Sequence, residues 1–182
     1  MTATHLATAE DLLQMGSRAP YELWEGALRE VSTPGFRAAV YGARLAIATF
    51  SFADAQGLGY VTSARCGYTL SEHPDTVVAP DVGFVRGDRF PDGMPDRGFC
   101  PVPPDLAIEV ISPTDTKAEM AEKQALYAKA GVPLVWWVDP ERKTATVHRL
   151  GHAPEVVEAK GVLDGGDVLP GFELALQAIF RD

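Results

Sequence analysis

One segment constrains the fold of this chain more than any other, because it contains two apolar runs separated by a helical pattern. Leu106–Ile111 is apolar apart from one glutamate, and Leu134–Asp139 is a second apolar run. Between them, Thr114–Ala130 has the pattern of a helix, which Gly131 and Pro133 end. A strand–helix–strand unit of this length places its two strands parallel, with a right-handed crossover. The segment therefore predicts the centre of a sheet buried on both faces.

The other expected elements surround this unit. Antiparallel strands before the parallel pair predict a mixed sheet with helices on its faces, an α/β fold. At 182 residues we expect one domain spanning 1–182. The remaining elements are expected at a helix begun by Thr8, a hairpin over Tyr21–Val31, a helix over Phe36–Gln56, strands over Gly59–Arg65, Gly67–Leu70 and Val77–Val85, a loop over Arg86–Pro104, a strand over Thr144–Leu150, a weak strand over Glu155–Ala159 and a terminal segment over Leu174–Phe180.

Composition excludes some classes of protein. The chain has 16 basic and 25 acidic side chains, a formal net charge of −9. DNA-binding modules that act by neutralising phosphate charge are usually basic, so the charge gives that class no support. The two cysteines, Cys66 and Cys100, lie far apart in sequence and have no CxxC spacing. A disulfide-dense secreted scaffold and a zinc finger are therefore excluded.

Membrane and export signals are not expected. The segment Met1–Glu10 has neither a basic region nor an apolar region of the kind that signal peptides contain. The most apolar longer stretch, Ala38–Ala55, includes Arg44 and Asp54 and is too polar to span a bilayer. We expect a cytoplasmic protein that does not enter a membrane.

Glu109 is the unusual residue of the central strand. Both faces of Leu106–Ile111 are apolar except at this carboxylate. A buried unpaired carboxylate is costly, so Glu109 needs a partner, and a metal ion or a lysine is the usual one. A glutamate exposed at a sheet edge, or one in a purely structural ion pair, explains the pattern as well.

Asp81 is a second candidate, because it follows Pro80 within a strand-like stretch. Proline withholds a hydrogen-bond donor from a sheet and favours a bend or a strand end, which presents the next side chain to a cleft. An aspartate in this setting also serves as a turn or hydrogen-bonding residue.

Lys123 is the third candidate. It lies between Met120 and Tyr127 on the helical stripe expected to pack on the sheet. Lysines are almost never fully buried without a partner. The alternative is a lysine at the edge of the stripe, with its ammonium group extended into water.

These residues belong to motifs that resemble a known family. The matching text includes Tyr21–Gly26, Ala79–Val82 and Pro104–Pro113. It continues at Lys123–Tyr127, Ala130–Val132, Trp137–Pro140 and Gly166–Gly171. In this order and spacing the motifs resemble the Uma-two family of putative restriction endonucleases, and the resemblance extends over nearly the whole chain.

The resemblance implies a fold of the PD-(D/E)XK nuclease type, with a mixed β-sheet flanked by helices. Asp81 matches the first acid of that motif and Glu109 the second. Ile111 stands where the superfamily has its lysine, and Lys123 on the following helix is the matching position in this family. Glu22 matches a family acid near the N-terminus, either as a further site residue or as a residue that orders the hairpin.

The same resemblance implies a metal-dependent endonuclease that hydrolyses phosphodiester bonds of nucleic acid, with DNA as the expected form. Asp81, Glu109 and the backbone carbonyl of Val110 would hold Mg²⁺ or Mn²⁺. Lys123 would orient the attacking water or neutralise the phosphate. A homodimer or a higher homo-oligomer is expected, because two sites in a symmetric pair can address both strands.

Two other functions stay open at this stage. One is a non-catalytic binding or assembly module with a nuclease fold, which the acidic charge favours. The other is hydrolysis of a different phosphorylated substrate, because fold does not fix substrate. The presence of Asp81, Glu109 and Lys123 together favours the nuclease.

Overall fold

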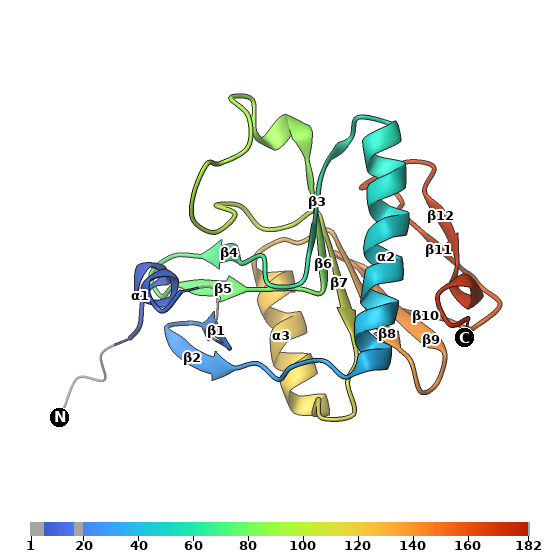
Figure 1. Ribbon diagram of the computed structural model, residues 1–182, viewed down its shortest axis with the longest axis horizontal. Helices are drawn as coiled ribbons and strands as arrows, with labels where there is room; N and C mark the ends of the chain where they lie inside the picture. Colours follow the sequence, from blue (N-terminus) through green and yellow to red (C-terminus); the bar gives the residue numbers. More distant parts are fainter. Residues whose placement is uncertain (1–5, 17–19, 182) are drawn as a thin grey trace.

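The predicted parallel pair forms the centre of the largest sheet (Figure 1). The computed structural model describes residues 6–16 and 20–181, and in these residues the strands form a six-stranded, a four-stranded and a two-stranded sheet. Strand β7 (Leu106–Val110) pairs in parallel with β8 (Leu134–Asp139). The six-stranded sheet has the order β10-β9-β8-β7-β6-β3, and its other pairs are antiparallel. Its outer members are β3 (Gly59–Ser63), β6 (Val82–Arg86), β9 (Thr144–Arg149) and β10 (Glu155–Val157).

The four-stranded sheet contains the hairpin predicted near the N-terminus. Its order is β2-β1-β5-β4, and β1 and β2 turn at Glu25 and Gly26, which both have positive φ. The members are β1 (Tyr21–Trp24), β2 (Ala27–Glu30), β4 (Tyr68–Ser71) and β5 (Thr76–Val78). The two-stranded sheet pairs β11 (Val162–Asp164) with β12 (Glu173–Ala175). The mixed α/β fold expected from the sequence is confirmed.

The prediction of one strand over Val77–Val85 is wrong. The segment divides into β5 and β6, which belong to different sheets, with Pro80 and Asp81 between them. The physical reason is that proline has no N–H to donate, so a sheet ladder cannot continue through it. The break places Asp81 where the two sheets meet.

The crossover helix is shorter than predicted. Helix α3 (Lys117–Lys129) begins after Thr116, whose side chain accepts a hydrogen bond from the Glu119 amide in a reciprocal capping box. Residues 112–115 form a turn before it. The structure also contains short elements, namely α1 (Ala9–Gln14) begun by Thr8, η1 (Gly87–Arg89) inside the expected loop, and η2 (Leu176–Ala178) near the C-terminus.

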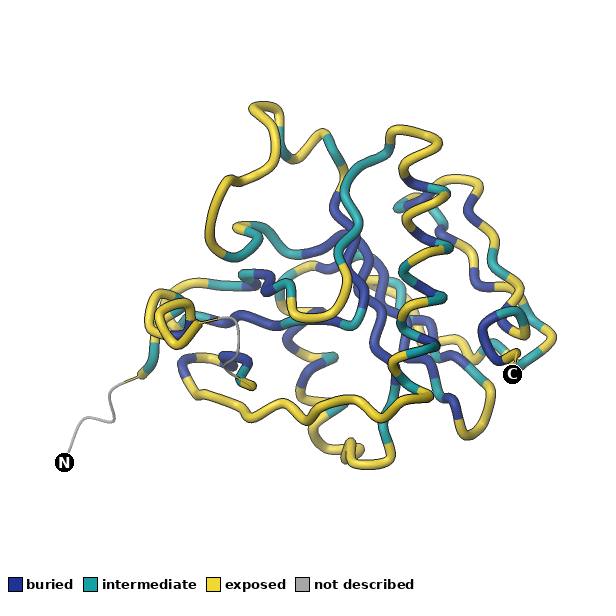
Figure 2. Tube along the Cα trace, viewed as in Figure 1, coloured by how far each residue is buried: buried dark blue, intermediate teal, exposed yellow. Residues whose placement is uncertain are grey.

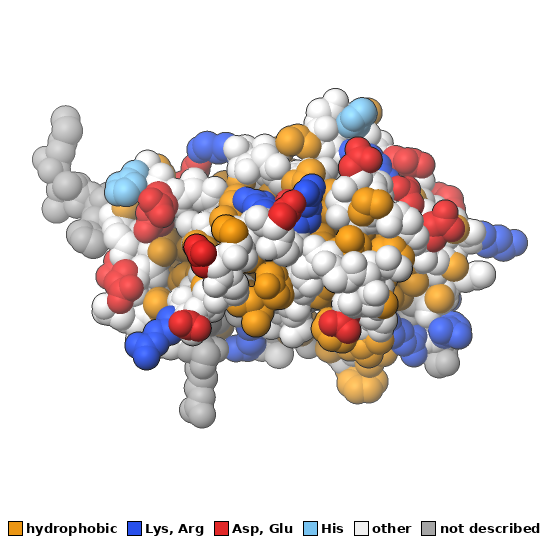
Figure 3. Space-filling view, turned by 90° about the horizontal axis from the view of Figure 1, so that it is seen from above, with side chains coloured by type: hydrophobic (Ala, Val, Ile, Leu, Met, Phe, Trp, Pro, Cys, Tyr) orange, Lys and Arg blue, Asp and Glu red, His pale blue; other side chains and the backbone are white. Residues whose placement is uncertain are grey.

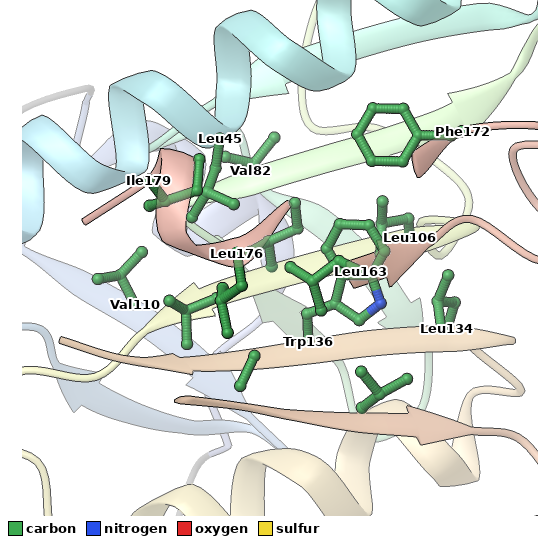
Figure 4. Close-up of a cluster of buried hydrophobic side chains, with 14 of the residues drawn as sticks. Leu45, Val82, Leu106, Val110, Leu134, Trp136, Leu163, Phe172, Leu176 and Ile179 are labelled. Carbon is green, nitrogen blue, oxygen red and sulfur yellow. The ribbon is translucent and has the colours of Figure 1, made fainter. Parts of the chain in front are cut away.

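Two helices cover the two faces of the six-stranded sheet. On one face, α2 (Phe36–Ala55) buries Tyr41 and Leu45 against the central strands, and Figure 4 shows Leu45 within this cluster. On the other face, α3 buries Leu126 and Tyr127. Strand β7 is buried on both faces, as predicted. Ile108 packs in the cluster under α2, and its neighbour Ala107 packs in the cluster under α3. Figure 2 shows the strands between the helices as the most continuously buried part of the chain.

Two expectations from composition can be compared with the described residues. No helix in the described part of the chain is long and apolar enough to cross a membrane. Cys66 and Cys100 are both free and half-buried, in agreement with the exclusion of a disulfide scaffold.

The two sides of α2 give a test of this packing. Leu45 is fully buried and Ile47 is 65% exposed, although both lie on the same helix. We expect Leu45→Ala to lower the free energy of unfolding by about 2–5 kcal/mol, because it leaves a cavity in the core. Ser51→Ala, at an exposed position of the same helix, should change it by no more than about 0.5 kcal/mol. Urea denaturation measures both, and equal losses would contradict the assigned orientation of α2.

Candidate active site

Glu109 points from the middle strand of the six-stranded sheet toward α3. Its side chain is buried, and its Oε1 atom lies 2.7 Å from the Lys123 ammonium nitrogen. The Tyr127 hydroxyl donates a hydrogen bond to the same oxygen at 2.6 Å. Glu109 is therefore a buried and paired carboxylate, and not a residue exposed at a sheet edge.

Lys123 reaches this carboxylate from α3, one turn before Tyr127. Its ammonium nitrogen also lies 2.9 Å from Oε1 of Glu22, so it contacts two carboxylates. Lys123 is only 9% exposed, which excludes an ammonium group extended into water. Another lysine of the same helix, Lys117, is exposed at the first position of α3.

Glu22 joins the N-terminal hairpin to this cluster. Its Oε1 also accepts a hydrogen bond from the Ala79 amide at 2.9 Å, and its Oε2 accepts one from the Trp24 indole at 2.7 Å. The side chain is 3% exposed. Glu22 therefore contacts both the lysine and the segment just before Asp81.

Asp81 lies beside the end of β7. Its Oδ2 atom accepts a hydrogen bond from the Val110 amide at 2.7 Å, which holds its carboxylate next to the residue that follows Glu109. Glu22, Asp81, Glu109, Val110 and Lys123 all line one cavity of about 500 Å³. The structure thus brings together every site residue predicted from the sequence.

Burial controls the ionisation of this cluster. It raises the pKa of Glu109 to about 7, although the Lys123 charge acts in the opposite direction. It also raises the pKa of Asp81, against the hydrogen bond from Val110. For Lys123, burial lowers the pKa, but the two neighbouring carboxylates outweigh it and keep the ammonium form. Burial, followed by the Glu109 charge, raises the pKa of Tyr127, so its hydroxyl stays protonated and donates a hydrogen bond to Glu109.

The donor set of the cavity fits a hard divalent cation. Among the described residues, none makes a hydrogen bond to Oδ1 of Asp81 or Oε2 of Glu109, and both carboxylates line the cavity. The described part of the chain has no group of three or more His, Cys, Asp or Glu side chains placed to hold a metal. Mg²⁺ commonly uses only one or two carboxylates and fills its other positions with further oxygens. Two carboxylates and the Val110 carbonyl therefore suit Mg²⁺ or Mn²⁺.

Tyr127 contacts Glu109 and two tryptophans line the cavity, although the sequence did not assign them to the site. Tyr127 was recognised as a neighbour of Lys123 on the helical stripe, and this i+4 spacing is the signal that could have suggested its contact with Glu109. Trp24 and Trp137 are buried, as expected of core residues, and they also line the cavity. Trp136 is fully buried in the α2 cluster.

The raised pKa of Glu109 makes stability depend on pH. The pKa rises from an ordinary value of 4.5 to about 7 in the folded protein, so folding favours the protonated carboxyl. The corresponding stability is present below pH 4.5 and is lost as the pH rises through about 7. In metal-free buffer we expect the wild-type free energy of unfolding to fall over this range, with a smaller fall in Glu109→Gln. Chemical denaturation at a series of pH values measures how the free energy of unfolding of each protein depends on pH. An identical dependence in the two proteins would contradict a raised pKa of Glu109.

Comparisons with known proteins agree with this geometry. The Uma2 (Uma-two) family, described as "Putative restriction endonuclease", matches residues 9–177. A solved structure of a "putative nuclease belonging to DUF820" from Anabaena variabilis ATCC 29413 has a TM-score of 0.81 at 20% sequence identity, over 95% of this chain and 97% of that chain. That likeness shows a shared fold. The comparison with curated proteins gives no match. Because the family match extends over most of the sequence, this chain belongs to the Uma2 family of putative restriction endonucleases.

Proposed function

We propose that this chain is a metal-dependent endonuclease that hydrolyses phosphodiester bonds of nucleic acid, with DNA as its substrate. One observation carries the proposal, namely that the Lys123 ammonium lies 2.7 Å from Glu109 in a cavity that Asp81 also lines. Phosphodiester hydrolysis needs charge neutralisation and an oriented water, and this arrangement offers residues for both. Membership of the family supports nuclease chemistry.

Each residue has a distinct part in the proposed reaction. Asp81, Glu109 and the Val110 carbonyl would hold Mg²⁺ or Mn²⁺. When bound, such an ion supplies positive charge to the transition state and lowers the pKa of a coordinated water. Lys123 keeps its positive charge and would direct it toward the attacking water or the phosphate. Glu22 would be a positioning residue, because it forms a second ion pair with the lysine beside that of Glu109.

Tyr127 is the second positioning residue. Its hydroxyl holds Oε1 of Glu109 at 2.6 Å, which leaves Oε2 of that carboxylate without a hydrogen bond to any described residue. A carboxylate fixed at one oxygen presents the other in a constant direction, and such preorganisation lowers the cost of reaching the reactive geometry.

The charge of the cavity rim affects how nucleic acid approaches. Glu30, Asp115 and Glu119 line the cavity beside the buried carboxylates. Arg29 also lines it, but its guanidinium is paired with Glu122 at 2.8 Å. A phosphate backbone therefore meets an acidic rim, and a bound cation would offset the repulsion. A homodimer would also enlarge the contact surface and let two sites address both strands.

A non-catalytic binding or assembly module is the second candidate. The observation that favours it is that the Lys123 ammonium already has two carboxylate partners, as in a structural ion pair. Such a module would bind nucleic acid or protein without hydrolysis, so a cleavage assay separates the two candidates. A parallel screen of phosphomonoesters tests hydrolysis of another phosphorylated substrate.

Metal binding gives the first test. We expect about 5 mM Mn²⁺ to raise the melting temperature of the wild type, because a ligand that binds only the folded state stabilises it by mass action. Asp81→Asn should lose the rise and should also lose cleavage of plasmid and oligonucleotide substrates. The matched control is Asp96→Asn in the exposed loop, which should keep both. An unchanged wild-type melting temperature, together with no cleavage, would contradict the proposal.

Lys123 gives the second test. Lys123→Met leaves the carboxylates of Glu22 and Glu109 without their ammonium partner, so we expect it to lower stability as well as activity. At a temperature where the variant is folded by circular dichroism, its cleavage rate should fall ~100-fold or more. Lys117→Met, an equivalent change at an exposed lysine of the same helix, should keep the wild-type rate. A folded Lys123→Met with the full rate would refute the role of the lysine.

A further inference from the structure

Helix α2 has an apolar face that the rest of the described chain does not cover. Phe36 is 88% exposed, Ile47 is 65% exposed and Phe50 is 53% exposed. In Figure 3, hydrophobic side chains project from the lower edge of the molecule, right of centre, on the side where α2 lies in Figure 1. We call this face the outer stripe of α2. It comprises the exposed residues Phe36, Ala43, Ile47, Phe50 and Asp54, together with Val40, which is half-buried and also packs against the core cluster under α2.

The spacing of the outer stripe is that of a helix–helix seam. Its residues follow one another at alternating intervals of four and three, the pattern by which two helices pack along their length. The intervals also read the same in both directions, with their centre at Leu45 on the opposite side of the helix. A second copy of α2 in antiparallel orientation therefore meets this stripe with an equivalent one.

In that antiparallel register, large side chains face smaller ones. Ala43 lies opposite Ile47 of the second copy, and by the two-fold symmetry the same contact occurs twice. Val40 lies opposite Phe50 in the same way. A stripe with only large residues would hold the helix axes apart, whereas alternating sizes allow close packing.

Charge distinguishes the antiparallel pairing from the parallel one. Arg37 lies at the start of α2 and Asp54 near its end, both are exposed, and neither forms an ion pair with a described residue. Antiparallel pairing brings Arg37 of each copy beside Asp54 of the other. Parallel pairing would place like charges together, which is unfavourable. Arg37 and Asp54 therefore favour the antiparallel pairing of two copies of this chain.

We propose that the outer stripe of α2 is the surface by which two copies of this chain associate, antiparallel about a two-fold axis near position 45. The inference deepens the proposed function, on which it rests only for the expectation of a homodimer. Thr33 and Pro34 precede α2 and line the cavity. The antiparallel pair thus places the two cavities toward opposite ends of a helix pair about 30 Å long.

Sedimentation equilibrium of the full chain tests the proposal. At about 50 µM we expect a mass of two chains for the wild type, since association depends on protomer concentration. Ile47→Lys should give the 19.6 kDa mass of one chain. Its matched control is Val156→Lys on β10, an equivalent change at a residue 57% exposed, which should leave the dimer intact. Far-UV circular dichroism spectra that match the wild type would show that both variants are folded. The melting temperature of Ile47→Lys should be lower than that of the wild type, because the variant lacks the stabilisation that association gives.

A charge exchange tests the orientation. Arg37→Asp should weaken dimerisation, and Arg37→Asp combined with Asp54→Arg should restore it, because the pair is re-formed between copies. A monomeric wild type, or a dimer that survives Ile47→Lys, would overturn the proposal, as would a double variant no stronger than the single one. Mn²⁺ stabilisation of the monomeric Ile47→Lys variant reports on the metal site separately, so failure of the interface and failure of the proposed function are distinguishable.

Discussion

The arrangement of this protein around its cavity depends on one buried lysine side chain. The Lys123 ammonium lies between Glu22 and Glu109, at 2.9 Å and 2.7 Å, and so joins the N-terminal hairpin, the central strand and the crossover helix. Removing one partner of a buried ion pair costs about 3–5 kcal/mol, because the remaining charge is left uncompensated. The relative positions of these three elements, and with them the shape of the cavity, therefore follow from this contact.

The two carboxylates proposed to hold a cation reach the cavity by different structural means. Glu109 belongs to a regular strand, and its direction follows from the alternation of that strand. Asp81 belongs to the break after Pro80, where the chain passes from one sheet to another. A hydrogen bond from the Val110 amide holds Asp81 beside the end of the same strand. Burial raises the pKa of both carboxyls, and a cation bound beside them would favour their ionised forms.

Much of the site could be predicted from the sequence, because local patterns determine it. The apolar pattern of Leu106–Ile111 marked Glu109 as a carboxylate that needs a partner if it is buried, and helical spacing placed Lys123 on the stripe expected to face the sheet. Their assignment to one site came from the resemblance to the family. The contact of Glu22 could not be derived in this way, since Glu22 and Lys123 are 101 positions apart and the contact arises only when the hairpin packs on α3. The division of the segment over Val77–Val85 between two sheets was missed for a related reason. Proline predicted an interruption, but sheet membership depends on distant partner strands.

We propose that Asp81 and Glu109 together hold one divalent cation. Anomalous diffraction from crystals containing Mn²⁺ tests it most directly, because the signal locates the metal without reference to activity. We expect one strong peak within coordination distance of both carboxylates and of the Val110 carbonyl, with waters completing the coordination shell. A cavity with no peak at millimolar Mn²⁺, or a peak held by other residues, would contradict it.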